Sequence, residues 1–134
     1  MTFLVDTNII SELSRRSPDH GVLAWAGGVT QLAVSVISVD EVFFGLAWRP
    51  NPRVLGWMEA FFQRHEVLMI SEAIARRAGE LRGQLAGRGV VREQADMLIA
   101  ATAQAHQLTL VTRNTKDFES CGIGLLNPFS DPGS

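Results

Sequence analysis

The order of apolar and polar residues along the chain predicts short strands that alternate with helices. Apolar runs with the length and composition of buried strands lie at residues 2–5, 32–36, 66–70, 108–112 and 124–126. Between them, apolar side chains recur every three or four positions, as on the inner face of a helix, over residues 9–13, 39–46, 54–62, 71–87 and 93–105. No hairpin signal such as Asn-Gly joins two strands, so right-handed crossovers and a mostly parallel sheet are expected. The pattern therefore predicts an α/β fold, a three-layer α/β/α sandwich.

The length and composition favour a single domain. The chain has 134 residues, of which 46% are hydrophobic, enough to bury one core without disulfides. We find no repeat or linker, so residues 1–134 are predicted to form one domain. Residues 127–134, which contain two prolines and a glycine, are expected to be a frayed tail.

Charge and cysteine content exclude several classes of protein. With 12 basic and 14 acidic side chains the chain has no global basic field, so any site for a polyanion must be local. One cysteine, Cys121, excludes an internal disulfide and a cysteine-rich zinc site. Neither a signal segment nor an apolar run of membrane-spanning length is present, so we expect a cytoplasmic protein without a membrane partner.

Four acidic residues fall where predicted strands end or helices begin. Asp6 directly follows the first strand, and Glu41 lies one turn into a helix expected to begin at Ser38. Asp96 is near the start of its helix, and Asp117 follows the last clear strand. Ligands of open parallel sheets bind at the carboxyl ends of the strands. All four acids can therefore face one pole of the sheet.

Each acid taken alone also has a purely structural explanation. Asp6 could cap the helix that it precedes, and Asp96 in a first helical turn would complement the helix dipole. Glu41 could reach back to the Ser38 amide as a capping box, and Asp117 could simply be solvated. The four acids together are a more specific indication of function than any one of them alone.

Taken together, the acids point to a divalent metal ion. Asp6 and Asp96 lie among apolar or small residues, where an uncompensated charge is costly and neighbouring residues supply no cation. Oxygen ligands without histidine or cysteine favour Mg²⁺ or Mn²⁺, either one ion or two. Such an ion promotes phosphodiester hydrolysis, and either Glu41 or Asp96 could orient the attacking water.

Four sequence blocks resemble a known family. They are Leu-Val-Asp-Thr-Asn at 4–8, Ser-Val-Asp-Glu at 38–41 with Gly45 beyond it, Asp-Met-Leu-Ile-Ala-Ala-Thr-Ala at 96–103, and Leu-Val-Thr-Arg-Asn at 110–114 followed by Asp117-Phe118. In this order and spacing they resemble the PIN-domain ribonucleases, and within them the VapC-type toxins of bacterial toxin–antitoxin modules. The resemblance covers nearly the whole chain.

The resemblance implies a metal-dependent endoribonuclease in which Asp6, Glu41 and Asp96 coordinate Mg²⁺ or Mn²⁺. Members of the family place a fourth acid at one of two positions. One position is occupied here by Asn114, which has no charge, and the other by Asp117. We therefore expect Asp117 to complete the catalytic set and Asn114 to support it.

Polar residues beside the acids are candidate supporting groups. Thr7, Asn8 and Thr112 match the family pattern and could hydrogen-bond the ligand carboxylates. Turn and cap chemistry would equally account for these residue types. Arg113 and Lys116 are possible contacts to the RNA backbone.

The resemblance also implies partners. They are an RNA substrate, a second copy of the chain in a homodimer, and a VapB-like antitoxin whose tail lies across the active-site groove. DNA would be bound only indirectly, through the antitoxin. An aromatic-rich stripe over residues 57–62, with further aromatic residues before it, is a candidate partner surface, although most of these side chains are expected in the core.

Two rival interpretations use the same residues. Aspartyl-phosphate hydrolases also begin with a strand that ends in Asp, but they usually carry a second Asp two residues later, where this chain has Asn8. A non-catalytic PIN-like module that binds RNA or a partner would need vestigial acids. The intact set of Asp6, Glu41 and Asp96 argues against that alternative.

Overall fold

The computed structural model describes residues 2–131 and contains one five-stranded sheet. Its strands are β1 (Phe3–Val5), β2 (Ala33–Ser35), β3 (Glu66–Leu68), β4 (Thr109–Val111) and β5 (Leu125–Leu126). They run in the order β3-β2-β1-β4-β5, and every neighbouring pair is parallel. The predicted mostly parallel sheet is confirmed.

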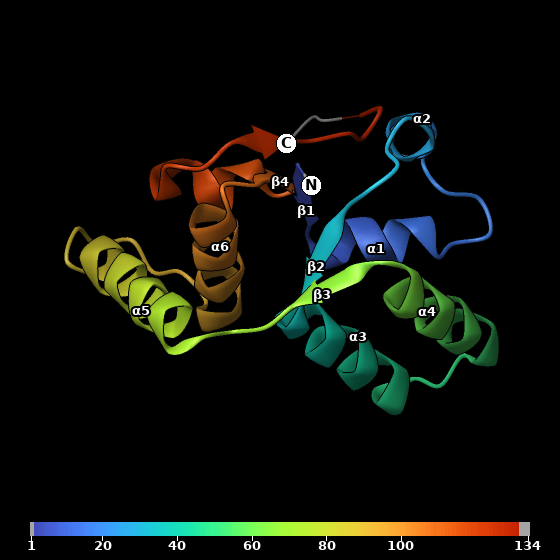
Figure 1. The fold of residues 1–134 in the computed structure, drawn as a ribbon, viewed down its shortest axis with the longest axis horizontal. Coiled ribbons are helices and arrows are strands. Elements are labelled where there is room, and N and C mark those ends of the chain that lie inside the picture. The colour runs from blue at the N-terminus through green and yellow to red at the C-terminus, as the bar shows by residue number, and fades with distance from the viewer. Residues whose placement is uncertain (1, 132–134) are drawn as a thin grey trace.

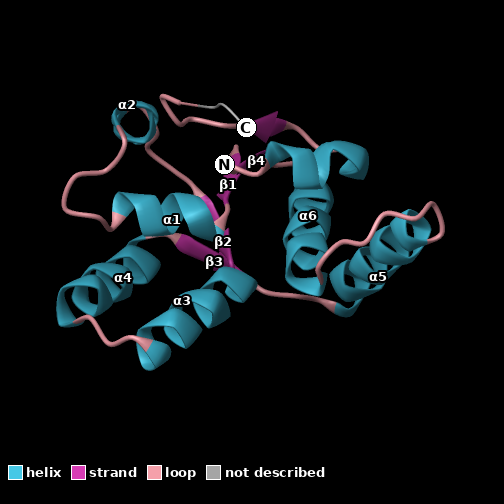
Figure 2. Ribbon diagram, turned by 180° about the vertical axis from the view of Figure 1, so that it is seen from behind, coloured by secondary structure: helices cyan, strands magenta, loops and turns pink. Residues whose placement is uncertain are grey.

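Helices cover both faces of this sheet, as Figure 1 shows and Figure 2 repeats from behind. They are α1 (Thr7–Leu13), α2 (His20–Gly27), α3 (Val36–Trp48), α4 (Pro52–Arg64), α5 (Glu72–Ala86), α6 (Gln94–His106) and a 3₁₀ helix, η1 (Thr115–Cys121). Helices α1, α3 and α4 lie on one side of the strands, and α5 and α6 lie on the other. Within residues 2–131, none of the helices combines the length and apolar character needed to cross a bilayer.

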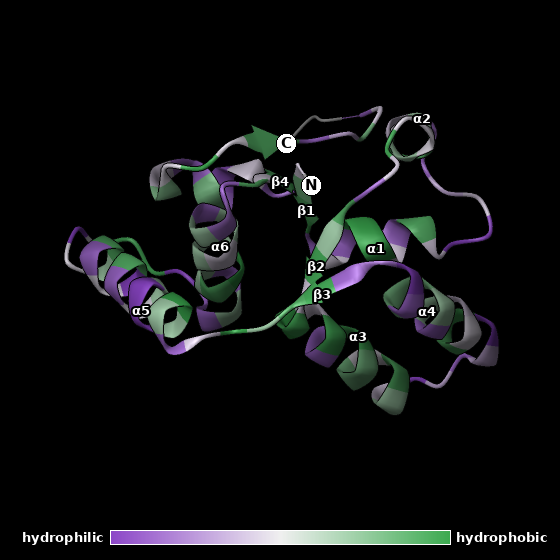
Figure 3. Ribbon diagram, viewed as in Figure 1, coloured by the Kyte–Doolittle hydropathy of each residue, from purple (hydrophilic) through white to green (hydrophobic). Residues whose placement is uncertain are grey.

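The two layers of core follow from the alternation of side chains along each strand. One core, beneath α1 to α4, takes one set of strand residues: Val5, Val34 and Val111. The other, beneath α5 and α6, takes their sequence neighbours: Leu4, Ala33 and Leu110. Figure 3 shows β1 and β2 as hydrophobic, with hydrophilic residues along α5. The strands are thus buried on both faces, as a parallel sheet requires.

Two helical features differ from the sequence-based expectation. Helix α2 was not predicted, because its eight residues alternate apolar and small side chains without a clear helical stripe. Helix α3 begins at Val36 rather than near Ser38, since the Ser35 hydroxyl accepts the Ile37 N–H at 3.0 Å and forms the N-cap. Ser38 lies buried inside the helix, so the capping-box explanation of Glu41 is wrong.

Residues 127–130 differ from the expected frayed tail. Phe129 is only 8% exposed and belongs to the core beneath α1 to α4. Ser130 donates hydrogen bonds to Asp19 through its N–H and its hydroxyl. The rest of that prediction, residues 132–134, lies outside the described residues.

Candidate active site

The sheet topology places the ends of β1 and β4 side by side. These strands are parallel neighbours in which Val5 is aligned with Val111. The Asp6 N–H continues the ladder by donating to the Val111 carbonyl at 2.9 Å. Because the strand order changes direction beside β1, a crevice is expected at this carboxyl edge. Asp6 and Thr112 therefore meet at that edge.

Asp6 is a buried carboxylate that is held from several sides. Its Oδ1 accepts the Thr7 N–H at 2.8 Å and caps α1, as the structural alternative expected. Its Oδ2 accepts the Thr112 hydroxyl at 2.8 Å and the Asn8 amide at 3.3 Å. Burial nevertheless raises the pKa of Asp6 above its usual value, against the lowering effect of these bonds. The nearby charge of Asp117 raises it further.

Glu41 reaches the same region from α3. The Thr7 hydroxyl hydrogen-bonds to Glu41 Oε1 at 2.6 Å and to Ser38 Oγ at 2.8 Å. This hydroxyl therefore joins the first turn of α1 to α3 and orients the half-buried Glu41 carboxylate. The contribution of Ser38 was not predicted, because a serine three residues before an acid was interpreted as a helix cap.

Asp96 lies half-buried in the first turn of α6 and has no side-chain hydrogen bond or ion pair among the described residues. Its pKa is raised to about 6, chiefly by burial and then by the charges of Asp6, Asp117, Glu93 and Glu41. The helix dipole alone would stabilise the charged form at this position. Burial and repulsion between carboxylates outweigh the dipole, so the four predicted acids lie within electrostatic reach of one another.

The two candidates for the fourth acid are placed differently. Asn114 is exposed before η1, and its backbone N–H donates to the Thr112 hydroxyl at 3.0 Å. Asp117 is half-buried in η1, and its charge raises the pKa of both Asp6 and Asp96. Arg92 Nε donates to the Asp117 carbonyl at 3.0 Å and ties η1 to the segment before α6. This hydrogen bond of Arg92 was not predicted from the sequence.

The chemistry of the donor set suits a hard divalent cation. The ion pairs in residues 2–131 are Arg15–Glu12 and Arg77–Glu80, so neither involves the four acids. The acids supply oxygen donors only, the type that Mg²⁺ and Mn²⁺ prefer. Within that same range, no group of three or more His, Cys, Asp or Glu is already arranged to hold a metal ion.

The candidate RNA contacts lie at the edge of this pole. Arg113 is exposed, and its backbone N–H donates to Asn8 Oδ1 at 3.1 Å. Its guanidinium carbon lies 4.4 Å from the centre of the Phe129 ring. Lys116 is exposed in η1. Both cations are therefore accessible beside the acids.

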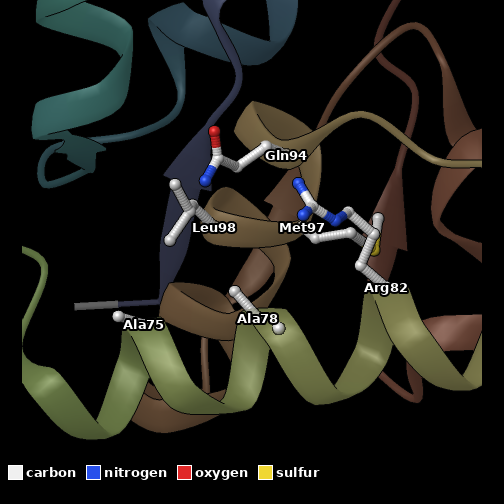
Figure 4. Close-up of a pocket in the computed structure, with 7 residues that line it drawn as sticks. Ala75, Ala78, Arg82, Gln94, Met97 and Leu98 are labelled. Atoms are coloured by element: carbon white, nitrogen blue, oxygen red, sulfur yellow. The ribbon is translucent and has the colours of Figure 1, made fainter.

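Two cavities lie on opposite sides of the sheet. One has a volume of about 100 Å³ and contains none of the four acids. It lies between α5 and α6, where Figure 4 shows Ala75, Ala78 and Arg82 of α5 facing Gln94, Met97 and Leu98 of α6. The other, of about 240 Å³, lies among α1, α3 and α4, and Thr7 and Glu41 form part of its wall. The rest of its lining is mostly small or apolar: Ser11, Ser14, Val42, Gly45, Leu46, Val54 and Met58. We call this second cavity the α1–α3–α4 groove.

Comparison with known proteins identifies the class to which this fold and acid cluster belong. The family profile of the PIN domain matches residues 3–122, and the chain belongs to that family. The similarity to VapC-type members of the family comes from a curated relative. This chain is 37% identical to the VapC ribonuclease Y4jK of Sinorhizobium fredii, over 94% of this chain and 96% of that protein.

Solved structures agree with this placement. FitAcB from Neisseria gonorrhoeae superposes with a TM-score of 0.82 at 31% identity, over 95% of this chain and 98% of that one. VapBC2 from Rickettsia felis, bound to a DNA fragment from its promoter, gives a TM-score of 0.80 at 28% identity, over 95% and 98% of the chains. The predicted resemblance and the predicted fold are both confirmed.

Proposed function

We propose that this protein is a Mg²⁺- or Mn²⁺-dependent endoribonuclease and the toxin of a VapBC-type toxin–antitoxin pair. The observation that carries the proposal is the pole of acids in a PIN domain: buried Asp6 and half-buried Asp96 have raised pKa values and no cationic partner among the described residues. A protein that keeps such charges together without compensation loses stability unless another ligand offsets the repulsion.

Asp6, Glu41, Asp96 and Asp117 are the residues that would hold the ion. When bound, a divalent ion lowers the pKa of a coordinated water and neutralises charge on the phosphoryl oxygens. Asp6 and Glu41 are already oriented, the first by Thr112 and Asn8 and the second by Thr7. Among the described residues the Asp96 side chain forms no hydrogen bond, and we assign it to accept the proton of the attacking water.

We assign the fourth position to Asp117. Its charge acts on both Asp6 and Asp96, whereas Asn114 is exposed and contributes no charge. Thr7, Asn8 and Thr112 support the ligands by hydrogen bonding, and Asn114 helps to orient the Thr112 hydroxyl through its backbone N–H. Arg113 and Lys116 are assigned to the RNA backbone.

The partners follow from the relatives and from the surface. VapBC2 of R. felis is a complex bound to promoter DNA, so we propose a VapB-like antitoxin here, with DNA bound only through it. The α1–α3–α4 groove, which is largely apolar and includes Glu41, is a suitable place for an antitoxin segment. Helix α3 exposes Phe44 and Trp48, 69% and 68% exposed, as a surface for the homodimer. We place the complex in the cytoplasm.

Cleavage of a mixed RNA pool by purified, antitoxin-free protein in Mn²⁺, Mg²⁺ or EDTA tests the proposal. We expect cutting in either metal, none in EDTA, and none with Asp96→Asn prepared in the same way. Glu41→Gln and Asp117→Asn should also be inactive. Asp40→Asn and Glu119→Gln, which remove equal charge from exposed neighbours on the same helices, should cut normally.

The same experiment distinguishes the nuclease from a non-catalytic PIN-like module. RNA binding without cleavage in any metal, by folded protein, would favour a non-catalytic binding module. Cleavage that survives in EDTA or in Asp96→Asn would indicate a contaminating nuclease and leave the acids without a role.

A further inference from the structure

The end of the described chain packs into the core beneath α1 to α4. We call residues 127–130 the C-terminal strap. Its turn is fixed by the Phe129 N–H, which donates to Asn127 Oδ1 at 3.0 Å. The Phe129 ring is buried in the core beneath α1 to α4, together with Ile9 and Val22. The strap is therefore part of the folded domain.

Asp19 fastens the strap to two helices. It accepts the Ser130 N–H at 2.9 Å and also the Ser130 hydroxyl. The same carboxylate caps α2 by accepting the Val22 N–H at 3.1 Å. The Asp19 N–H donates to Oε2 of the buried Glu12, in α1, at 2.8 Å. One aspartate thus links α1, α2 and the strap.

The strap also packs closely against α2 at Gly21. A Cβ atom at Gly21 would lie 2.3 Å from the Pro128 carbonyl oxygen and 2.6 Å from the Ser130 nitrogen. Both are backbone atoms that cannot rotate away. Only glycine fits, so the crossing point of the strap is fixed.

The fixed strap presents one aromatic ring to one cation. The guanidinium carbon of Arg113 lies 4.4 Å from the Phe129 ring centre, within the range of a cation–π contact. Arg113 directly follows Thr112, which binds Asp6, and its own N–H is bound to Asn8. Both ends of this arginine are therefore held, the backbone by Asn8 and the side chain by Phe129 of the strap. We call Asp6, Glu41, Asp96 and Asp117 the acid pole.

We propose that Phe129 is a positioning residue, which holds the Arg113 guanidinium ready to bind a phosphate of the RNA next to the acid pole. A guanidinium stacked on a ring keeps the N–H groups at its edge available for forked phosphate contacts. Holding a long side chain in place beforehand reduces the entropy that it loses on binding. The inference rests on the proposed ribonuclease function and assigns a role in RNA binding to a residue distant from the catalytic sequence blocks.

The test compares kcat and KM for wild type, Arg113→Ala, Phe129→Leu and Phe129→Tyr in Mn²⁺ over a range of salt concentrations. Arg113→Ala should raise KM, leave kcat unchanged, and reduce the slope of log KM against log salt by about 0.7, as for one lost contact to single-stranded RNA. Phe129→Leu removes the ring face and should raise KM about two- to fivefold. Phe129→Tyr retains the ring and should have a KM close to that of wild type.

A double variant decides whether the ring acts through the arginine. In the Arg113→Ala background, Phe129→Leu should have no further effect on KM. An equal effect in both backgrounds, or a fall in kcat with KM unchanged, would overturn the proposal and leave Phe129 as a core residue. Ser130→Ala, which loosens the strap without altering the core, should raise KM in the same direction; an unchanged KM and salt slope in both Ser130→Ala and Phe129→Leu also contradicts the proposal.

Failure of the proposed function would have a different result. If wild type cleaves no RNA in any metal, the same variants can be compared by equilibrium binding of a fluorescent single-stranded RNA. The strap proposal then stands if Arg113→Ala and Phe129→Leu weaken binding non-additively, and fails if they do not. Thermal melting of each variant ensures that the compared proteins are folded.

Discussion

Two aspartates cap consecutive helices in this protein and differ sharply in their electrostatics. Asp6 caps α1 and Asp19 caps α2. Each carboxylate accepts at least three hydrogen bonds. The pKa of Asp6 is nevertheless raised, whereas that of Asp19 is lowered to about 2, mainly by its bonds to Ser130.

The difference arises from the surroundings rather than from hydrogen bonding. Asp6 is 5% exposed and faces the charge of Asp117, so burial and repulsion outweigh its bonds. Asp19 is only half-buried, and there its bonds to the strap favour the charged form. The same residue type in the same helix position thus has its charged form disfavoured at Asp6 and favoured at Asp19. We call Asp6 the strained aspartate and Asp19 the satisfied one. This contrast separates a candidate metal ligand from a structural acid.

The largest expected effect comes from neutralising the strained aspartate. Asp6→Asn keeps the size of the side chain and removes a ligand charge, so we expect RNA cleavage to fall by on the order of 10³-fold. Asp40→Asn, the matched loss of one exposed charge, should retain wild-type activity. Initial rates at saturating Mn²⁺ measure both, and an active Asp6→Asn would remove Asp6 from the site.

The next effect concerns the support of Asp6. Thr112→Val removes the buried hydroxyl that donates to Asp6 Oδ2 at 2.8 Å, so we expect the affinity for Mn²⁺ to fall by about 10- to 100-fold. Thr102→Val is the control, because that buried hydroxyl bonds only to the Leu98 carbonyl of its own helix, at 2.8 Å. Titration of activity with Mn²⁺ measures the affinity of both variants. Equal affinities in the two variants would contradict a supporting role for Thr112.

A smaller effect is expected in the stability of the metal-free protein. The pKa of Asp96 is raised to about 6 from 3.8, so the folded state holds a proton that the unfolded state has lost between these values. Stability due to this group is complete below about pH 4 and is lost as the pH rises through 6. At pH 8 in EDTA, Asp96→Asn should therefore have a free energy of unfolding about 1 kcal/mol larger than wild type, after allowing for the partial exposure of Asp96, and a higher Tm.

The same melting experiment contains its own check. At pH 4 the advantage of Asp96→Asn should disappear, and at pH 8 Mn²⁺ should stabilise wild type more than the variant. An advantage that is independent of pH would mean that the substitution acts through packing rather than through charge.

The satisfied aspartate should respond to pH in the opposite direction. Because the pKa of Asp19 is lowered to about 2, its stabilising contribution is present above pH 4 and is lost as the pH falls through 2. Asp19→Asn should lower Tm at pH 7, and the difference from wild type should shrink towards pH 2. A difference that persists at pH 2 would show that the lost cap geometry, and not the charge, is responsible.

Much of the acid pole could be predicted because parallel strands fix where their ends lie. Asp6 and Asp117 follow strands, and a sheet without hairpins brings such ends to one edge. For Glu41, the sequence predicted a helix that begins at Ser38. The helix actually begins at Val36 and is capped by Ser35, a residue that had been assigned to the preceding strand. A local pattern cannot decide which of two serines three residues apart caps the helix when the same apolar pattern follows both.

The strap could not be predicted, because its contacts are remote in sequence. Asp19 and Ser130 are separated by 111 positions, and nothing near either residue indicates the other. The two prolines and the glycine near the end of the chain are typical of a disordered tail, although the chain actually packs Phe129 into the core. Composition reports the flexibility of an isolated segment and is silent on long-range contacts.

The central position of β1 has a consequence for the order in which the protein is made. This strand is the first to leave the ribosome, yet one of its two neighbours, β4, is synthesised about a hundred residues later. Asp6 therefore emerges early and has to wait for Asp96, Thr112 and Asp117, which all come from the last third of the chain. A nascent chain that lacks these later residues cannot bring the four acids together, so the sheet order delays assembly of the site until Asp117 has been made.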